Sequence, residues 1–416
     1  MNKWLRRILK GVGIVVGVLV VLVIGLVTYV QLTWDRPVSR AVPQMTAPTD
    51  AETVARGEYL YNYTQICWFC HGSEGSHSPG EPQAGGREFD ATDIGPGFGY
   101  LYGSNLTPDR ETGIGDWSDG ELVRAIREGL DREGHLIFPI MEAEWYRGMS
   151  DQDALALVAY LRSLPPVRNE VPANQLSFAA KALMALGMIK PQPAVTEQAV
   201  VPPRGATMEY GEYLTLHGSM CAGCHTPRSP NTGVYDMTRP FGGGDFLIAE
   251  EGVDTTGPNI TPDVTTGIGD WTQEQFVTAM RTGVRPDGTV MVTFMPWPVY
   301  TRWTEDDLRA VWLYLRSLEP VAHEAPASVL TGQAATGTGS ARGEGLYGVY
   351  CATCHGGEGA GSLLTTMALK DAGLGMDDTT LARFIAEGLS GTSMPGYGKT
   401  LTEEQIAALV AFIRTW

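Results

Sequence analysis

The sequence contains one five-residue pattern, Cys-x-x-Cys-His, three times. It reads CWFCH at residues 67–71, CAGCH at 221–225 and CATCH at 351–355. The chain has six cysteines, and all of them lie in these motifs. The fold must therefore present each cysteine pair together with the histidine that follows it.

Three kinds of site use closely spaced cysteines without a cofactor. A structural zinc site needs four Cys or His ligands, commonly two neighbouring pairs, whereas each pair here is far along the chain from the next. A thioredoxin-like redox pair is expected in a βαβ setting and needs no histidine. Disulfide bonds are the default in an exported protein, but they leave His71, His225 and His355 unexplained.

Covalent haem accounts for every residue of the motif. Two thiols one helical turn apart form thioethers with the porphyrin vinyl groups, and the adjacent histidine ligates the iron. The sequence therefore predicts three haem c groups. Their attachment residues are Cys67, Cys70, Cys221, Cys224, Cys351 and Cys354, and their proximal iron ligands are His71, His225 and His355.

The chain repeats itself at an offset of 154 residues, as from Cys67 to Cys221. GSNLTPDRETGIGDW at 103–117 matches GPNITPDVTTGIGDW at 257–271. A third, shorter unit lacks this insert but keeps a helix before its motif and a final amphipathic helix. Apolar residues recur at helical spacing and no strand-like alternation persists, so the sequence predicts an all-α fold of three tandem units.

Methionine sulfur is the expected sixth ligand of each iron. The offset maps Met141 in FPIMEAEWY onto Met295 in TFMPWPVY, and Met394 in GTSMPGYG also precedes a last helix. Met141 is followed by Glu142, where the other two methionines are followed by proline. Other candidates in the first unit are His77, His135 and Met149; an open sixth position is a further alternative. The second unit has Asn231, Thr289 and Trp303 at those places.

The N-terminus has no charged residue from Gly11 to Trp34. As a helix, this run spans about 36 Å, enough to cross a hydrocarbon core of about 30 Å. The four basic residues that precede it favour a cytoplasmic N-terminus. The sequence predicts a single-pass anchor in a bacterial inner (cytoplasmic) membrane that contacts lipid, with the haem units on the periplasmic side. A cleaved signal peptide is the alternative.

Composition and repeats predict the boundaries. Residues 1–35 form the basic flank and anchor, 49–167 unit 1, 168–204 a linker with a short helix, 205–321 unit 2, 322–340 a flexible linker, and 341–416 unit 3. The linker 322–340 is small and polar, which would leave unit 3 mobile. The net charge of −17 argues against nucleic acid as a partner.

Local signals place particular side chains. Ser118 and Thr272 are expected to cap the helices that follow them. Gly343 and Tyr347 should face Phe412 of the last helix. In the repeated insert, Asn105, Asn259, Trp117 and Trp271 could bind haem propionates or order the loop. Each proximal histidine should donate its other ring N–H to a backbone carbonyl.

The inserts, CHTPR at 224–228 and VPANQLSF at 171–178 give the chain a family resemblance. It resembles the tri-haem cytochrome c subunit of membrane-bound alcohol, aldehyde and gluconate dehydrogenases, built from class I cytochrome c domains. The resemblance implies a relay, without a catalytic site of its own, from a dehydrogenase catalytic subunit to quinone or a terminal oxidase. It pairs His71 with Met141, His225 with Met295, and His355 with Met394. The alternatives are a subunit of another respiratory or photosynthetic complex, or a haem enzyme with an open site in unit 1.

Overall fold

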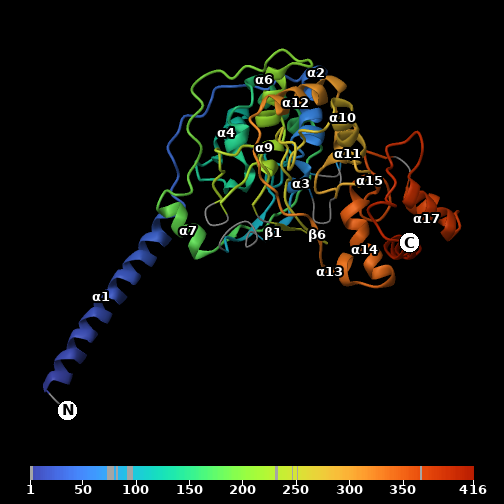
Figure 1. The fold of residues 1–416 in the computed structure, drawn as a ribbon. Coiled ribbons are helices and arrows are strands. Elements are labelled where there is room, and N and C mark those ends of the chain that lie inside the picture. Colours follow the sequence, from blue (N-terminus) through green and yellow to red (C-terminus); the bar gives the residue numbers. More distant parts are fainter. Residues whose placement is uncertain are drawn as a thin grey trace.

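The computed structural model describes residues 3–72, 79–80, 83–90, 97–229, 233–245, 247–250, 252–365 and 368–416. Most of its regular structure is helical. One long N-terminal helix projects from a helical body, and the C-terminal helices lie on the side of the body away from it (Figure 1).

Helix α1 (Lys3–Thr33) carries the apolar N-terminal run. Its side chains from Trp4 to Tyr29 are exposed, and in the described part of the chain it is the one helix long and apolar enough to cross a membrane. The predicted N-terminal helix is confirmed; a membrane anchor and a signal sequence both have this form.

Units 1 and 2 contain the same series of helices, except that the 3-10 helix of unit 1 has no counterpart among the described residues of unit 2. Unit 1 comprises α2 (Ala51–Tyr59), the π-helix η1 (Leu60–Thr64), α3 (Trp68–His71), α4 (Asp119–Glu128), the 3-10 helix η2 (Pro139–Met141), α5 (Ala143–Tyr146) and α6 (Asp151–Ser163). Unit 2 comprises α8 (Met208–Tyr213), the π-helix η3 (Leu214–Gly218), α9 (Cys221–His225), α10 (Gln273–Thr282), α11 (Trp297–Tyr300) and α12 (Glu305–Ser317). Unit 3 comprises α14 (Gly339–Tyr350), α15 (Ala352–His355), α16 (Leu369–Leu374), α17 (Asp378–Glu387) and α18 (Glu403–Ile413).

In each unit the helix before the Cys-x-x-Cys-His motif crosses the last helix. A glycine stands at each crossing, and a Cβ on Gly57, Gly211 or Gly343 would overlap a carbonyl oxygen of the partner helix. The expected contact of Tyr347 with Phe412 is confirmed, with ring centroids 5.5 Å apart. Small residues at these points let the backbones approach closely.

The second helix of each long unit begins as its sequence predicts. Ser118 forms a capping box with Glu121, and Thr272 forms one with Gln275. Both helices end at a glycine in the left-handed region, Gly129 at φ 67° in α4 and its counterpart in α10 at φ 71°. The side chains thus satisfy backbone N–H groups at the start, and glycine permits the turn at the end.

The all-α prediction was incomplete, because the described residues also form two three-stranded antiparallel sheets. One pairs β1 (Glu88–Asp90) with β2 (Gly99–Tyr102) and β2 with β3 (Gln175–Leu176). The other pairs β4 (Ile248–Glu250) with β5 (Val253–Thr255) and β5 with β6 (Val329–Leu330). These strands have two to four residues, which is too short for an alternating pattern to be recognised.

The outer strands lie in the segments that the sequence assigned to linkers. β3 and α7 (Phe178–Ala185) follow unit 1, and β6 and α13 (Gly332–Thr336) follow unit 2 at the same offset of 154 residues. Residues 322–340 are therefore not the flexible linker expected, since β6 pairs with β5 and α13 packs on α14. Strand pairing and helix packing override the flexible composition of this segment.

Candidate haem-binding sites

Each Cys-x-x-Cys-His motif lies in a short helical turn, in α3, α9 and α15 or directly before it. The cysteines are free and at least half-buried. Burial raises the pKa of the Cys70 thiol to about 11 and that of the Cys67 and Cys354 thiols to about 12. Such surroundings favour an uncharged sulfur, as in a thioether, over a free thiolate.

The chain passes close to the backbone of the first two motifs. A Cβ on Gly103 would overlap the carbonyl oxygen of Cys70, and one on Gly257 would overlap that of Cys224. Gly103 and Gly257 occupy equivalent places in the repeat. Both motifs are thus held against the insert that follows them.

The first two histidines are oriented by equivalent backbone carbonyls. His71 Nδ1 lies 2.9 Å from the carbonyl oxygen of Ser104, and His225 Nδ1 lies 2.7 Å from that of Pro258. The expected carbonyl partner is confirmed for both residues. With Nδ1 as the donor, Nε2 is the nitrogen left to ligate iron.

His355 differs from the other two histidines. Its Nδ1 is buried and has no hydrogen-bond partner in the part of the chain that the structure describes. Burial lowers the pKa of all three imidazoles, which favours the neutral form that binds a metal. The residues therefore fit a haem whose iron is ligated by a neutral histidine.

The three candidate methionines are half-buried and occupy equivalent places before the last helices. Met141 ends η2, Met295 lies in the turn before α11, and Met394 lies in the loop between α17 and α18. Met141 and Met295 pack against the main hydrophobic core.

A buried tyrosine follows each of these methionines at a short interval. Tyr146, Tyr300 and Tyr397 have a pKa well above the usual value, first because they are buried and then because a cysteine pair lies near each ring. The pairs are respectively those at 67 and 70, 221 and 224, and 351 and 354. The segment after each methionine therefore passes near the cysteine pair of its own unit.

Of the other candidates for the sixth ligand in unit 1, Met149 and His135 lie outside the helix η2 that Met141 ends. Met149 is 1% exposed and stands where unit 2 has the buried Trp303, so it fills the core. His135 is partly exposed, with its Nδ1 3.5 Å from Asp131. His77 and Asn231 lie outside the described residues.

Glu142 takes the place of the proline that follows the other two methionines. Its backbone has φ 57°, in the left-handed region, whereas Pro296 has φ −77°. Its buried carboxylate accepts a 2.5 Å hydrogen bond from Tyr235 and pairs with Arg228 at 3.5 Å. The departure from proline therefore connects the Met141 segment to unit 2.

The first and second candidate sites adjoin each other. Phe69, a spacer residue of the first motif, meets Phe294 edge-on at 6.1 Å between ring centroids. The Tyr146 hydroxyl lies 2.9 Å from the sulfur of Met220, beside the second motif. Tyr146 is also close enough to Cys224 for that thiol to influence its pKa.

The second and third candidate sites adjoin through the loop that precedes Met295. The backbone N–H and the hydroxyl of Thr293 both donate to the carbonyl oxygen of Val349, at 3.0 and 2.8 Å. Val349 lies two residues before Cys351. Val290 N–H donates to Thr400 Oγ1 at 2.7 Å.

The insert asparagines order their loops. Asn105 Nδ2 donates to the Val167 carbonyl at 2.9 Å, and Asn259 Nδ2 donates to the Val321 carbonyl at 2.7 Å. Of the two roles considered, the contacts favour loop ordering. Trp117 and Trp271 are half-buried against the main core.

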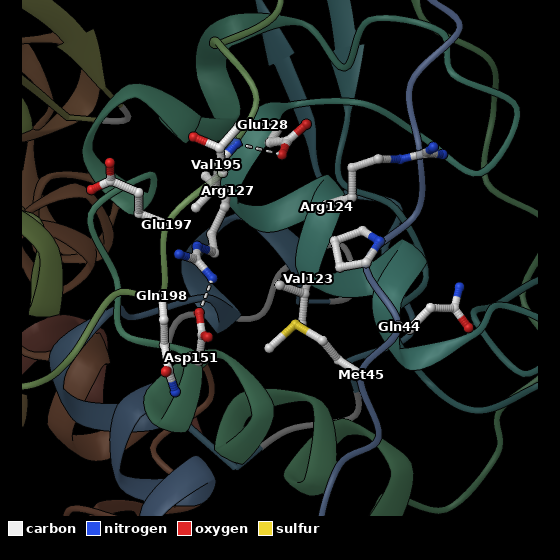
Figure 2. A pocket seen from close by; sticks show the side chains of 12 residues that line it. Gln44, Met45, Val123, Arg124, Arg127, Glu128, Asp151, Val195, Glu197 and Gln198 are labelled. Carbon is white, nitrogen blue, oxygen red and sulfur yellow. Dashed lines mark hydrogen bonds and ion pairs between the residues drawn. The ribbon is translucent and has the colours of Figure 1, made fainter.

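A polar cavity of about 330 Å³ lies apart from the motifs, between α4 and the chain segments around Met45 and Val195. Figure 2 shows Arg127 directed towards Asp151, 2.5 Å away, and Glu128 meeting the backbone of Val195. Arg127 pairs with Asp151 across the lining, Glu128 pairs with Arg40, and Arg124 donates to the backbone carbonyl of Arg132 at 3.0 Å. None of the motif cysteines or histidines lines the cavity.

Sequence reasoning missed the three buried tyrosines and the partners of Glu142. A signal for the tyrosines was present, because FPIMEAEWY, TFMPWPVY and SMPGYG each carry a tyrosine three to five residues after the methionine. The partners of Glu142 had no such signal.

The chain is similar in sequence to known cytochrome c proteins. A family model described as cytochrome c oxidase, cbb3-type, subunit III matches residues 339–413. The gluconate 2-dehydrogenase cytochrome c subunit of Pantoea cypripedii is 32% identical over 394 residues, covering 87% of this chain and 85% of that protein. The cytochrome c subunit of the quinone alcohol dehydrogenase of Gluconacetobacter polyoxogenes is 29% identical, covering 89% and 81%. The fructose dehydrogenase cytochrome subunit of Gluconobacter japonicus is 26% identical, covering 90% and 82%.

Proposed function

The chain belongs to the family of dehydrogenase cytochrome c subunits, and we propose that it is a membrane-anchored tri-haem relay. In this proposal it accepts electrons from a dehydrogenase catalytic subunit on the periplasmic side and delivers them to quinone or a terminal oxidase. The observation that carries the proposal is the adjacency of the candidate sites along one chain. Phe69 meets Phe294 between the first two, and Thr293 bonds Val349 between the second and third.

The proposed ligand set has two axial residues for each iron. The pairs are His71 with Met141, His225 with Met295, and His355 with Met394. Haem c, when bound, supplies one-electron exchange between Fe(III) and Fe(II). The protein's part is to hold neutral imidazoles in a fixed orientation, as the carbonyls of Ser104 and Pro258 do, and to keep the cysteine pairs away from water.

The buried tyrosines support this arrangement. Tyr146, Tyr300 and Tyr397 each lie near enough to the cysteine pair of their own unit for those thiols to raise the tyrosine pKa further. With a histidine and a methionine as ligands in each unit, these residues would leave no open position for a small ligand on a bound haem.

Helix α1 is proposed to anchor the chain. Its uncharged stretch is long enough to span the hydrocarbon core, and basic residues precede it. With this orientation of α1, the three units lie outside the cytoplasm. Haem attachment to cysteines and the proposed dehydrogenase subunit are in the same compartment.

Haem counting and carbon monoxide binding test the relay. The full chain, produced with its haem-attachment machinery, should carry three thioether-bound haems per polypeptide, and its reduced form should not bind carbon monoxide stoichiometrically. Fewer than three haems would end the tri-haem proposal. Stoichiometric binding at one haem would instead assign an open, enzyme-like site to that unit.

A further inference from the structure

The segment that follows unit 1 has an apolar surface beside the end of α1. Helix α7 packs its inner face, with Ala180 and Met184 buried, against a second hydrophobic cluster that includes Trp34. Its outer side and the turn that follows expose three large apolar side chains. These are Phe178, Leu186 and Met188, with 44%, 58% and 59% of their surface accessible.

This surface lies where α1 meets the body (Figure 1). The Tyr29 hydroxyl donates to the carbonyl oxygen of Ala185 at 3.4 Å, and Lys181 lies 4.9 Å from the centre of the Trp34 ring. About 20 residues of helix from Gly11 cross a core of about 30 Å and end near Val30. Tyr29 and Trp34, and with them α7, are therefore at the depth of the outer headgroups, where tyrosine and tryptophan are enriched.

The charges of this segment differ from those of the rest of the chain. Residues 171–196 contain no aspartate or glutamate, although the chain has 47 acidic residues. They do contain Lys181 and Lys190. A segment with exposed apolar side chains and only positive charge fits a surface of anionic phospholipids.

The repeat provides an internal comparison. In unit 2 the same place is taken by β6 and α13, which pack on β5 and α14. The stretch 332–342 reads GQAATGTGSAR and has no large apolar residue. The helix itself therefore does not require exposed apolar side chains, and their presence in unit 1 needs a separate cause.

We propose that α7 and residues 186–188 form a second membrane contact, which lies in the outer headgroup region and fixes the orientation of the haem units above the bilayer. Gly187, in the left-handed region at φ 69°, turns the chain between Leu186 and Met188 so that both remain exposed. The inference rests on the proposed role of α1 as an anchor. A single spanning helix leaves the body free to rotate, whereas a second contact beside it does not.

Photolabelling of the full chain tests this contact. The haem-loaded protein is reconstituted into vesicles of phosphatidylcholine and phosphatidylglycerol that contain a phospholipid with a photoreactive acyl chain, and the adducts are located by mass spectrometry. Adducts are expected on α1 and on peptides from 171–190, and not on the counterpart peptides from 325–342. Adducts on α1 without any on 171–190 would overturn the proposal, and absence of adducts on α1 would instead overturn the anchor.

A triple variant and a measurement with the catalytic subunit test whether the exposed apolar side chains contact lipid. The exposed triple substitution Phe178→Ser, Leu186→Ser and Met188→Ser should abolish the adducts on 171–190 while those on α1 and the haem content stay unchanged. Retention of the 171–190 adducts in this variant would contradict the contact. Protection of 171–190 seen only when the catalytic subunit is bound would assign this surface to that subunit and overturn the lipid contact.

Discussion

The Tyr59 hydroxyl donates a hydrogen bond of 2.6 Å to a carboxylate oxygen of Asp307, and so joins unit 1 to unit 2. The same contact occurs in the opposite direction, since Tyr213 donates to Asp153 at 2.8 Å. Tyr59 and Tyr213, like Asp153 and Asp307, are 154 residues apart. The contacts of α5 with η3 and of α11 with η1 are exchanged in the same way. The duplicated units therefore meet as two copies meet across a two-fold interface, which brings their candidate sites together.

The two carboxylates of this interface should differ in importance. Asp153 is fully buried and accepts hydrogen bonds of 2.9 Å from Arg56 at both oxygens. Its replacement in Asp153→Ala leaves Arg56 buried without a counter-charge, which should cost about 3–5 kcal/mol of unfolding free energy. Urea titration of the haem-loaded chain gives this value.

Asp307 provides the matched control. It has no ion pair among the residues that the structure describes, so Asp307→Ala should cost only about 1–3 kcal/mol. Tyr59→Phe and Tyr213→Phe should each cost about 1 kcal/mol. Equal losses for Asp153→Ala and Asp307→Ala would show that the ion pair with Arg56 does not set the difference.

The features of the fold that the sequence predicted are those that depend on residues close to one another in the chain. Ser118 and Thr272 were identifiable as caps because the residue they bond lies three positions away. The strands were not, because β3 has two residues and its pairing with β2 joins positions more than seventy residues apart. Glu142 stood out as a departure from proline. Its partner Tyr235 is 93 residues away, and no local pattern encodes that distance.

Glu142 should tolerate glutamine but not proline. Proline requires φ near −65°, which the backbone at φ 57° does not have, so Glu142→Pro should displace the Met141 segment. We expect this variant to lose about one third of the sulfur-to-iron charge-transfer absorption if three methionines contribute equally. Glu142→Gln keeps an acceptor for Tyr235 and should retain the band. An unchanged band in Glu142→Pro would show that the backbone conformation at Glu142 does not determine whether Met141 ligates the iron.

The repeated insert should make stability sensitive to acid. Hydrogen bonds from Thr266 and Thr265 lower the pKa of Asp263 to about 2. In the unfolded chain an aspartate has a pKa of about 3.9. The folded state therefore gains stability that is complete above about pH 4 and is lost as the pH falls towards 2.

Asp263→Asn checks this pH dependence. Asparagine does not ionise in this range, so the decline of Tm between about pH 4 and pH 2 should be shallower in the variant than in the original chain. Thermal unfolding at a series of pH values, followed by circular dichroism, measures the two slopes. Parallel slopes would mean that other carboxylates account for the acid sensitivity.

Two glycines of α14 should respond oppositely to alanine. A Cβ on Gly343 would overlap the carbonyl oxygen of Ala408 where α14 crosses α18, whereas nothing lies within 4 Å of a Cβ on the exposed Gly348. Gly343→Ala must push the helices apart and should cost about 1–3 kcal/mol or more of unfolding free energy. Gly348→Ala should stabilise the chain by about 0.5–1 kcal/mol, because alanine has less backbone freedom to lose. Urea titration of both haem-loaded variants measures the difference, and a neutral Gly343→Ala would show that α14 and α18 do not cross as closely as the structure places them.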